Sequence, residues 1–350
     1  MLNRRFLINS LGAAAFAMAG LAAVSSAGFA QEVTLRLHQF LPPQANVPKQ
    51  ILFPWAERVE KASGGRIKVD IFSAMALGGT PPQLIDQVRD GVVDIVWTLP
   101  GYSPGRFPRA EVFELPFMMT NAEAVSRAYW QLYEDDMKDA DFKDFQILGA
   151  WVHGPGVIHA KGEGVRSLAD MKGKKLRGPT RVINDMLNEA GATPVGMPVP
   201  AIPEALSKGV IDGTVIPWEV TPALKIAELV NTHTEIGGDR ALYTATFVLA
   251  MNKQRYAALP DDLRKILDDN SGLEFSALAG RTMQEYDAPG RKIAEDSDNQ
   301  IVVIEGDALA EWRAVADPVV ARWIAEMDAK GIDGQALFDK ARALIDKNSM

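Results

Sequence analysis

The chain has 350 residues, no cysteine, 23% charged residues and a formal charge of −8. This length predicts two lobes, and the lack of cysteine excludes disulfide scaffolds, thiolate-bound zinc, iron–sulfur clusters and thiol catalysis. An acidic chain without a basic run argues against nucleic acid or an anionic membrane as a partner. The four histidines form no HxH or HxxxH pair, so we expect no metal site and no cofactor.

The N-terminal segment 1–30 has the pattern of an export signal. Arg4 and Arg5 provide a basic start, an apolar and alanine-rich stretch follows, and the segment ends in small residues that a signal peptidase prefers. We predict cleavage before Gln31 and a periplasmic mature protein, with both the general and the twin-arginine route open. A transmembrane anchor is the alternative, but the apolar run is short and poor in large aliphatic residues. No later stretch predicts direct membrane anchoring.

After the signal, the apolar pattern alternates between strand and helix periods. Alternating apolar residues predict strands over 33–38 and 66–72, and helical spacing predicts helices over 48–62 and 80–91. A buried strand is predicted over 92–97. Strand, helix and strand in close succession form a βαβ unit, which indicates a parallel sheet and an α/β fold.

The second half of the chain repeats this arrangement. A short strand over 174–177 precedes a helix that begins at Thr180, and a helix opened by Pro203 precedes a strand over 210–216. The remaining predicted elements are strands over 244–251 and 301–304 and helices over 309–330 and 335–346.

One phrase occurs twice, as Gly91-Val92-Val93-Asp94 and as Gly209-Val210-Ile211-Asp212. A turn from helix to strand commonly uses glycine and then β-branched residues, which is one explanation. The other explanation is a pair of structurally similar lobes.

The sequence Gly101-Tyr102-Ser103-Pro104-Gly105 matches the G-x-S-x-G nucleophile elbow. However, prolines interrupt the helix that should follow the serine, and no Asp and His pair follows near the C-terminus. No Walker A or dinucleotide motif occurs. We therefore expect a binding protein rather than an enzyme, with an exported hydrolase using Ser103 as an alternative.

Arg177 stands at the end of a predicted strand, just before the helix that Thr180 begins. Ligands of parallel α/β sheets bind at this end of the strands, and a helix N-terminus attracts anions. A guanidinium group can hold a carboxylate through two parallel hydrogen bonds. Near other predicted strand ends are four aromatic residues, which favour a pocket around this anion site: Trp97, Tyr102, Trp151 and Trp218.

Four phrases, in order along the chain, resemble the signature of solute-binding proteins of tripartite ATP-independent periplasmic (TRAP) transporters, the DctP-like family. They are Gly91 to Asp94, Phe113 to Phe117, Ser167 to Arg177, and Leu206 to Gly213 followed by Pro217. The resemblance implies two α/β lobes joined by crossing segments that include a long helix, with a ligand cleft between the lobes. It places 31–154 and about 243–281 in lobe I, and 155–242 and about 282–350 in lobe II.

The same resemblance implies an organic acid as ligand, delivery to a small and a large membrane subunit, and a carboxylate-binding role for Arg177. An ABC-type organic-acid binding protein is an alternative with a different partner. Sialic-acid-binding members resemble this chain but have asparagine where Ile216 stands and an arginine near Val157. These changes make the cleft less polar, so we predict an aromatic or oxo monocarboxylate as the ligand.

The predicted site combines these residues. Arg177, with Thr180 and backbone N–H groups, binds the carboxylate, and His153 or Glu219 supplies one orienting hydrogen bond. The remainder of the pocket is shaped by five aromatic residues: Phe40, Trp97, Tyr102, Trp151 and Trp218.

Overall fold

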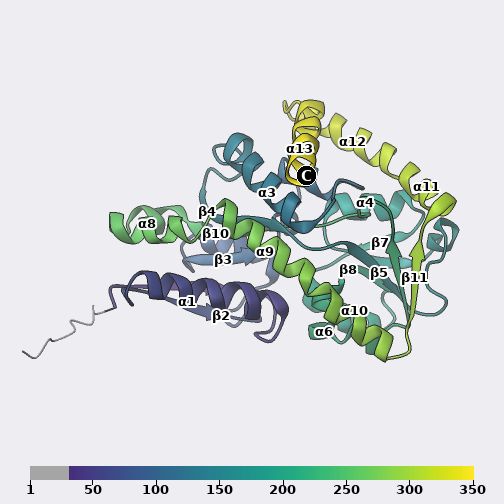
Figure 1. Ribbon diagram of the computed structural model, residues 1–350, viewed down its shortest axis with the longest axis horizontal. Coiled ribbons are helices and arrows are strands. Elements are labelled where there is room, and N and C mark those ends of the chain that lie inside the picture. The colour runs from purple at the N-terminus through teal and green to yellow at the C-terminus, as the bar shows by residue number, and fades with distance from the viewer. Residues whose placement is uncertain (1–30) are drawn as a thin grey trace, which may run out of the picture.

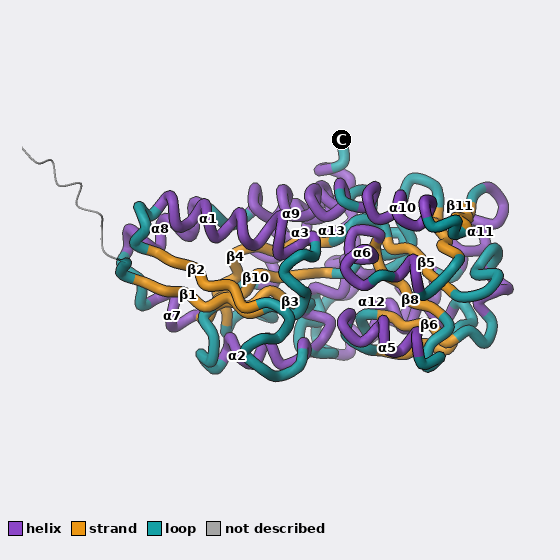
Figure 2. The backbone as a smooth tube through the Cα atoms, turned by 90° about the horizontal axis from the view of Figure 1, so that it is seen from below, coloured by secondary structure: helices purple, strands orange, loops and turns teal. Residues whose placement is uncertain are grey.

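The strands of residues 31–350, the part of the chain that the computed structural model describes, form two sheets. The predicted export signal lies outside these residues. The sheets lie side by side along the length of the molecule, each covered by helices (Figures 1 and 2). The predicted two-lobed α/β fold is thus confirmed.

The first sheet has five strands in the order β2-β1-β3-β10-β4. β1 is parallel to β2 and β3, whereas β10 is antiparallel to both of its neighbours. Alternate residues of β1, such as Leu35 and Leu37, are fully buried, as the apolar alternation predicts. The strands are β1 Val33–His38, β2 Ile67–Phe72, β3 Ile95–Thr98, β4 Phe145–Val152 and β10 Thr246–Asn252.

The second sheet has six strands in the order β11-β9-β5-β8-β6-β7. β6 is parallel to β7 and β8, and β5 is antiparallel to β8 and β9. The strands are β5 Gly156–Ala160, β6 Lys175–Gly178, β7 Thr193–Gly196, β8 Gly213–Pro217, β9 Thr232–Ile236 and β11 Gln300–Ile304.

Helices pack on both sheets through apolar stripes. In α4, Val182, Ile183, Met186 and Leu187 stand at helical spacing and are buried. None of the helices in residues 31–350 has the length and apolar character needed to cross a membrane. The helices are α1 Phe53–Ala62, α2 Leu84–Arg89, α3 Ala122–Leu132, α4 Arg181–Glu189, α5 Ile202–Ser207, α6 Thr221–Leu224, α7 Lys253–Ala257, α8 Asp261–Asp269, α9 Leu273–Glu285, α10 Asp287–Asp296, α11 Gly306–Ala314, α12 Ala316–Ala329 and α13 Gly334–Asn348.

The chain crosses between the lobes at 153–155, at 237–245 and where α9 leads into α10 (Figure 1). The resemblance implies one long helix, whereas the structure has two helices that meet at Tyr286. Pro289 lacks the N–H group that would bond to the carbonyl group of Glu285, which explains the break. The predicted helix over 309–330 divides in the same way at Val315, three residues before Pro318.

The twice-occurring phrase has the same role in both sheets. The Asp94 carboxylate accepts a hydrogen bond from the Arg36 amide of β1, and the Asp212 carboxylate accepts one from the Lys175 amide of β6, each at 2.8 Å. In return, the Asp94 amide donates to the carbonyl oxygen of Arg36, and the Asp212 amide donates to that of Lys175. The lobes therefore share this local design.

β3 and β8 both begin three residues later than the sequence pattern predicts. Gly91 and Gly209 have positive φ angles of 72° and 68°, which turn the chain back on the preceding helix. The amides of Val92 and Val210 then bond to carbonyl groups in that helix at 2.9 Å, so these residues do not join the sheet.

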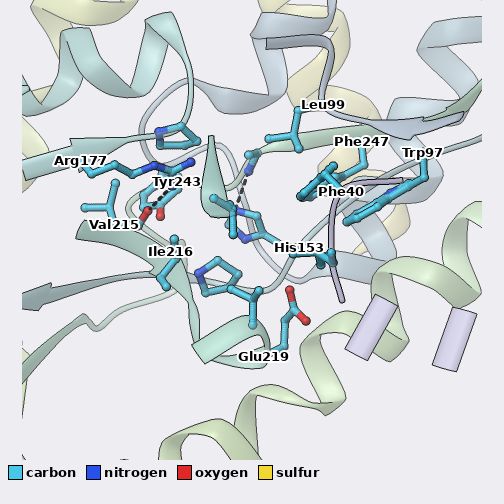
Figure 3. A pocket seen from close by; sticks show the side chains of 16 residues that line it. Phe40, Trp97, Leu99, His153, Arg177, Val215, Ile216, Glu219, Tyr243 and Phe247 are labelled. Atoms are coloured by element: carbon cyan, nitrogen blue, oxygen red, sulfur yellow. Dashed lines mark hydrogen bonds between the residues drawn. The ribbon is translucent and has the colours of Figure 1, made fainter. Parts of the chain in front are cut away.

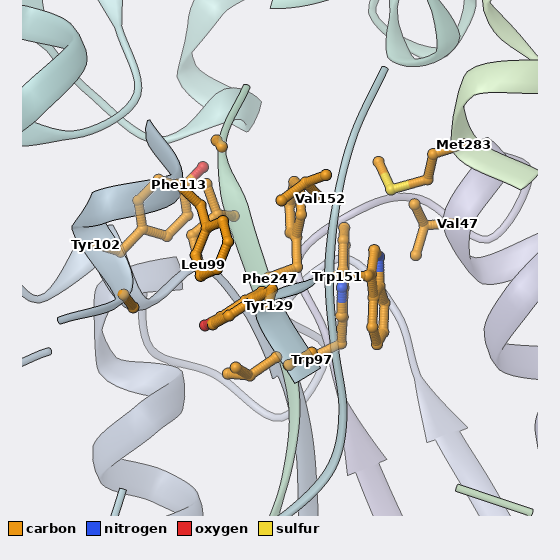
Figure 4. Close-up of a cluster of buried hydrophobic side chains, with 14 of the residues drawn as sticks. Val47, Trp97, Leu99, Tyr102, Phe113, Tyr129, Trp151, Val152, Phe247 and Met283 are labelled. Carbon is orange, nitrogen blue, oxygen red and sulfur yellow. The ribbon is translucent and has the colours of Figure 1, made fainter. Parts of the chain in front are cut away.

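Aromatic side chains fill much of the core of the first lobe (Figure 4). Trp97 stacks on Phe247 with ring centroids 5.1 Å apart, and Phe113 lies 5.0 Å from Tyr129. Each such ring buries a large apolar area, and ring pairs add about 0.5–1.5 kcal/mol. The side of this core that faces the second lobe forms part of a cavity.

Candidate functional site

A cavity lies between the lobes. Both sheets contribute to the wall, which is mainly apolar with a few polar groups (Figure 3). The apolar part of the wall includes Phe40, Trp97, Leu99, Val215, Ile216 and Phe247.

Arg177 of β6 lies at one side of this cavity and is fully buried. Its Nε donates to the carbonyl oxygen of Met197 at 2.8 Å and its Nη1 to that of Val215 at 3.2 Å. Nη2 has no hydrogen-bond partner within residues 31–350, and no carboxylate there forms an ion pair with the guanidinium group. Burial lowers the pKa of Arg177, and the nearby Tyr102 and Tyr243 oppose this effect. A buried cation without a counter-ion is costly, so the site favours an anion.

Tyr243 is a neighbour of Arg177 that sequence reasoning missed (Figure 3). Its ring lies against Gly156, where a Cβ atom would be 2.1 Å from the ring. The buried Tyr243 hydroxyl has no partner in the described residues, and burial raises its pKa, so it stays a neutral donor. Tyr243 belongs to the irregular crossing segment 237–245, where no periodic pattern marks it as part of a pocket.

Three aromatic rings form one wall of the cavity. Phe40 stacks on Trp97 with centroids 4.7 Å apart, and Trp97 stacks on Phe247 at 5.1 Å, both pairs within 14° of parallel. Phe40 and Trp97 were predicted, whereas Phe247 lies in an almost wholly apolar strand whose pattern indicates only burial. A flat aromatic wall suits an aromatic or other apolar ligand body.

His153 lines the cavity, but both of its ring nitrogens already have partners. Nε2 accepts a hydrogen bond from the Ala245 amide at 3.0 Å, so Nδ1 carries the proton and donates to the carbonyl oxygen of Gly154 at 2.5 Å. Burial lowers the pKa of His153 to about 4, which keeps the ring neutral. Of the two residues predicted to supply an orienting hydrogen bond, His153 therefore has both ring nitrogens occupied by protein partners in this structure.

Glu219 follows β8 and lines another part of the cavity (Figure 3). The side chain is buried, and its Oε2 atom has no partner in the described residues. Burial raises the pKa of Glu219 to about 8, against the opposing effect of Asn46. The group is thus mainly protonated at pH 7 and can both donate and accept a hydrogen bond.

Tyr102 and Thr180 lie at the contact between the lobes, outside the cavity wall. The Tyr102 hydroxyl accepts a hydrogen bond from the Val199 amide at 3.0 Å. The Thr180 hydroxyl donates to Glu114 at 2.6 Å. Tyr102 stays close enough to Arg177 to affect its pKa, whereas the Thr180 hydroxyl is occupied by Glu114.

The structure places Trp151 and Trp218 away from the cavity wall as well. The ring of Trp151 packs edge to face on Phe275 of α9, with centroids 5.6 Å apart. Trp218 packs against His159 and His233, and its indole N–H donates to Glu235 at 2.8 Å. Both rings are held by protein partners, and neither reaches the space beside Arg177.

The G-x-S-x-G match around Ser103 has a structural explanation. A Cβ atom at Gly101 would lie 2.3 Å from Thr180, so the close approach of the lobes requires glycine there. Gly105 has a φ of 76°, which also favours glycine. Ser103 lies in the turn between them, and the four histidines all have hydrogen-bond partners other than Ser103 within residues 31–350.

Solved structures of similar proteins share this architecture. A TRAP solute-binding protein from Rhodoferax ferrireducens in complex with copurified benzoate is 54% identical, with a TM-score of 0.88 over 90% of this chain and 98% of that chain. A marine metagenome TRAP protein specific for aromatic acid ligands, in complex with metahydroxyphenylacetate, is 49% identical, with a TM-score of 0.89 over 91% and 100%.

A third similar structure comes from Bordetella bronchiseptica. This TRAP periplasmic protein has (R)- and (S)-mandelate bound and is 31% identical, with a TM-score of 0.83 over 90% of this chain and 99% of that chain. The resemblance to TRAP solute-binding proteins that the sequence predicts is therefore confirmed. Residues 39–326 match the model of bacterial extracellular solute-binding protein, family 7 (DctP), and the chain belongs to this family.

Proposed function

We propose that this protein captures an aromatic monocarboxylate in the periplasm and delivers it to the small and large membrane subunits of a TRAP transporter. The observation that carries the proposal is Arg177, a buried guanidinium group whose Nη2 has no partner in residues 31–350 and which lies across the cavity from an aromatic wall. The role is binding without catalysis, as in the family to which the chain belongs.

The carboxylate end of the ligand is bound by Arg177 and Tyr243. Both side chains have a donor without a protein partner in residues 31–350, so a carboxylate gains charge-assisted hydrogen bonds without displacing existing ones. Among residues 31–350, Arg177 is the only arginine or lysine on the cavity wall. A second carboxylate would be buried without a cation, which favours a monocarboxylate.

The body of the ligand lies along Phe40, Trp97 and Phe247. Burial of an apolar ring there contributes about 25 cal/mol per Å². A sugar acid would instead bury several hydroxyls against apolar residues such as Ile216, and each unpaired hydroxyl costs roughly 1–3 kcal/mol. Uronic and sialic acids should therefore bind poorly.

The related proteins support this ligand class. Their structures contain benzoate, metahydroxyphenylacetate and mandelate, which each combine one carboxylate with an aromatic ring. No observation favours the ABC-type receptor or the Ser103 hydrolase as a second candidate.

Isothermal titration calorimetry of the purified protein tests the proposal. We expect benzoate and mandelate to bind more tightly than succinate and glucuronate at the same pH and salt concentration. Bound ligand should also raise the unfolding temperature, because a ligand at 100 times its Kd adds about 2.7 kcal/mol of stability. Tighter binding of succinate or glucuronate would refute the proposed ligand class.

The proposed location has its own test. N-terminal sequencing of protein released by osmotic shock should begin at Gln31, as the export signal predicts. Recovery of the chain only from spheroplasts, with its N-terminus intact, would contradict a periplasmic location.

A further inference from the structure

The cavity wall has a second polar group, Glu219, and Asn46 lies beside Glu219 outside the wall. Glu219 is 5% exposed and Asn46 is 7% exposed. The Oε2 atom of Glu219 is buried without a hydrogen-bond partner within residues 31–350, and the Asn46 amide is close enough to interact with the same carboxyl group. Such an atom on a cavity wall is unusual, because nearly all buried polar groups in proteins are paired.

This region is separate from the carboxylate-binding end. Figure 3 shows Arg177 and Tyr243 on one side of the cavity and Glu219 on another, with the carboxyl group of Glu219 directed inward. Phe40 and Trp97 form the apolar wall on the side away from Arg177. A ligand whose carboxylate is held by Arg177 thus has its ring available to Glu219.

We infer that Glu219, with Asn46 beside it, forms a specificity-determining subsite that selects aromatic acids carrying a hydroxyl group on the ring. The inference rests on the proposed function, since it requires the carboxylate of the ligand to be bound by Arg177. It adds a substituent class that the carboxylate and ring contacts alone do not specify.

The chemistry of the two side chains fits a hydroxyl group. Glu219 has no cationic partner in the described residues, and its own amide donates to the partly buried Asp287 carboxyl group at 2.9 Å. Burial and the neighbouring Glu219 both raise the pKa of Asp287, so two charges are disfavoured here. A protonated carboxyl group and an amide each offer a donor and an acceptor, which matches the donor and acceptor of a phenol. A ligand with an ammonium group at this position would instead require Glu219 to be an ionised carboxylate.

Titration calorimetry with benzoate, 3-hydroxybenzoate and 4-hydroxybenzoate tests this subsite. We expect at least one hydroxybenzoate to bind the wild-type protein about tenfold more tightly than benzoate, because the hydroxyl satisfies groups that benzoate leaves unpaired. Both isomers are used because the ring position nearest to Glu219 depends on how the carboxylate sits on Arg177.

Three variants identify the residue responsible. Glu219→Leu should bind benzoate within about threefold of wild type and lose the preference for the hydroxybenzoate. Glu219→Gln, which keeps a neutral donor and acceptor, should retain most of the preference. Glu235→Leu is the matched control, because Glu235 bonds to Trp218 and Arg291 and does not line the cavity. It should leave the ratio of the two affinities unchanged.

The outcomes separate the inference from the proposed function. Equal affinity of wild type for benzoate and both hydroxybenzoates would overturn the subsite and leave the proposed function standing, with water as the occupant of the Glu219 region. An unchanged preference in Glu219→Leu would also overturn it. Failure of all three acids to bind would refute the proposed function itself. If Glu219→Leu does not fold, the ratio of hydroxybenzoate to benzoate affinity in wild type and in Glu219→Gln decides. Absence of the preference for a hydroxybenzoate in both proteins would overturn the subsite.

Discussion

Arg177 combines deep burial with an incomplete set of hydrogen bonds. Two carbonyl oxygens position the guanidinium group, and Nη2 remains without a partner in residues 31–350. We predict that Arg177→Ala lowers the affinity for benzoate about a hundredfold, because a charge-assisted pair contributes on the order of 3 kcal/mol. Arg177→Lys should recover only part of the loss, since an ammonium group lacks the planar fork.

Titration calorimetry measures the affinities of these two variants, and circular dichroism shows whether each remains folded. A folded Arg177→Ala protein with the affinity of wild type would remove Arg177 from the binding site.

Tyr243 provides a more limited test at the same end of the cavity. Its hydroxyl is buried without a partner in the described residues, so Tyr243→Phe removes only the donor that we assign to the ligand carboxylate. We expect the affinity for benzoate to fall about threefold to tenfold, in line with one hydrogen bond of roughly 0.5–1.5 kcal/mol. Thermal unfolding without ligand should show no loss of stability, because the removed hydroxyl has no protein partner. A lower unfolding temperature with unchanged affinity would contradict this assignment.

At the scale of elements, the loop after β3 meets the start of α4 across the two lobes. A Cβ atom at Gly101 would lie 2.3 Å from Thr180. We predict that Gly101→Ala weakens ligand binding by about tenfold, because overpacking costs roughly 1–3 kcal/mol and here acts on the closed arrangement of the lobes.

Gly105→Ala is the control in the same loop. Gly105 has positive φ, but a Cβ atom there would have no neighbour within 4 Å, so alanine strains the backbone without touching the other lobe. It should lower the unfolding temperature and leave the affinity unchanged. Equal losses of affinity in both variants would show that the contact between Gly101 and Thr180 does not limit lobe closure.

The sequence predicts elements better than it predicts which rings line the cavity. The strand at 33–38, the stripe of α4 and the position of Arg177 follow from periodicity and from the chemistry of strand ends. Trp151 and Trp218 also stand near strand ends, but Trp151 packs on Phe275 of α9 and Trp218 on His159 of β5, both distant in the chain. Such contacts leave no local signal.

Boundaries and crossing segments show the same limit. The resemblance implies one long helix, whereas Pro289 follows the break between α9 and α10. Tyr243 lies in an irregular segment, so periodicity cannot place its side chain. Its position depends on Gly156, whose missing Cβ atom makes room for the ring.

For the whole molecule, Glu114 is a buried connection between the lobes. It accepts hydrogen bonds from Thr180 of the second lobe and from the amide and hydroxyl of Thr246 in β10. Burial raises the pKa of Glu114 to about 7, and nearby Glu111 acts in the same direction. The protonation state of one carboxyl group therefore affects the stability of the contact between the lobes.

We predict that Glu114→Gln makes the protein less sensitive to pH between about 5 and 8. In the unfolded chain Glu114 has its ordinary pKa near 4.5, so the folded state binds the extra proton between pH 4.5 and 7. The resulting stabilisation is complete below the lower value and is lost as the pH rises through the higher one.

Glutamine resembles the protonated side chain at every pH. Urea unfolding without ligand should thus show similar stabilities at pH 5 and a variant more stable by up to roughly 3 kcal/mol at pH 8. The other buried titratable groups, such as His153 and Glu219, are common to both proteins and cancel in the difference. A stability difference that stays constant from pH 5 to pH 8 would show that Glu114 keeps its ordinary pKa in the folded protein.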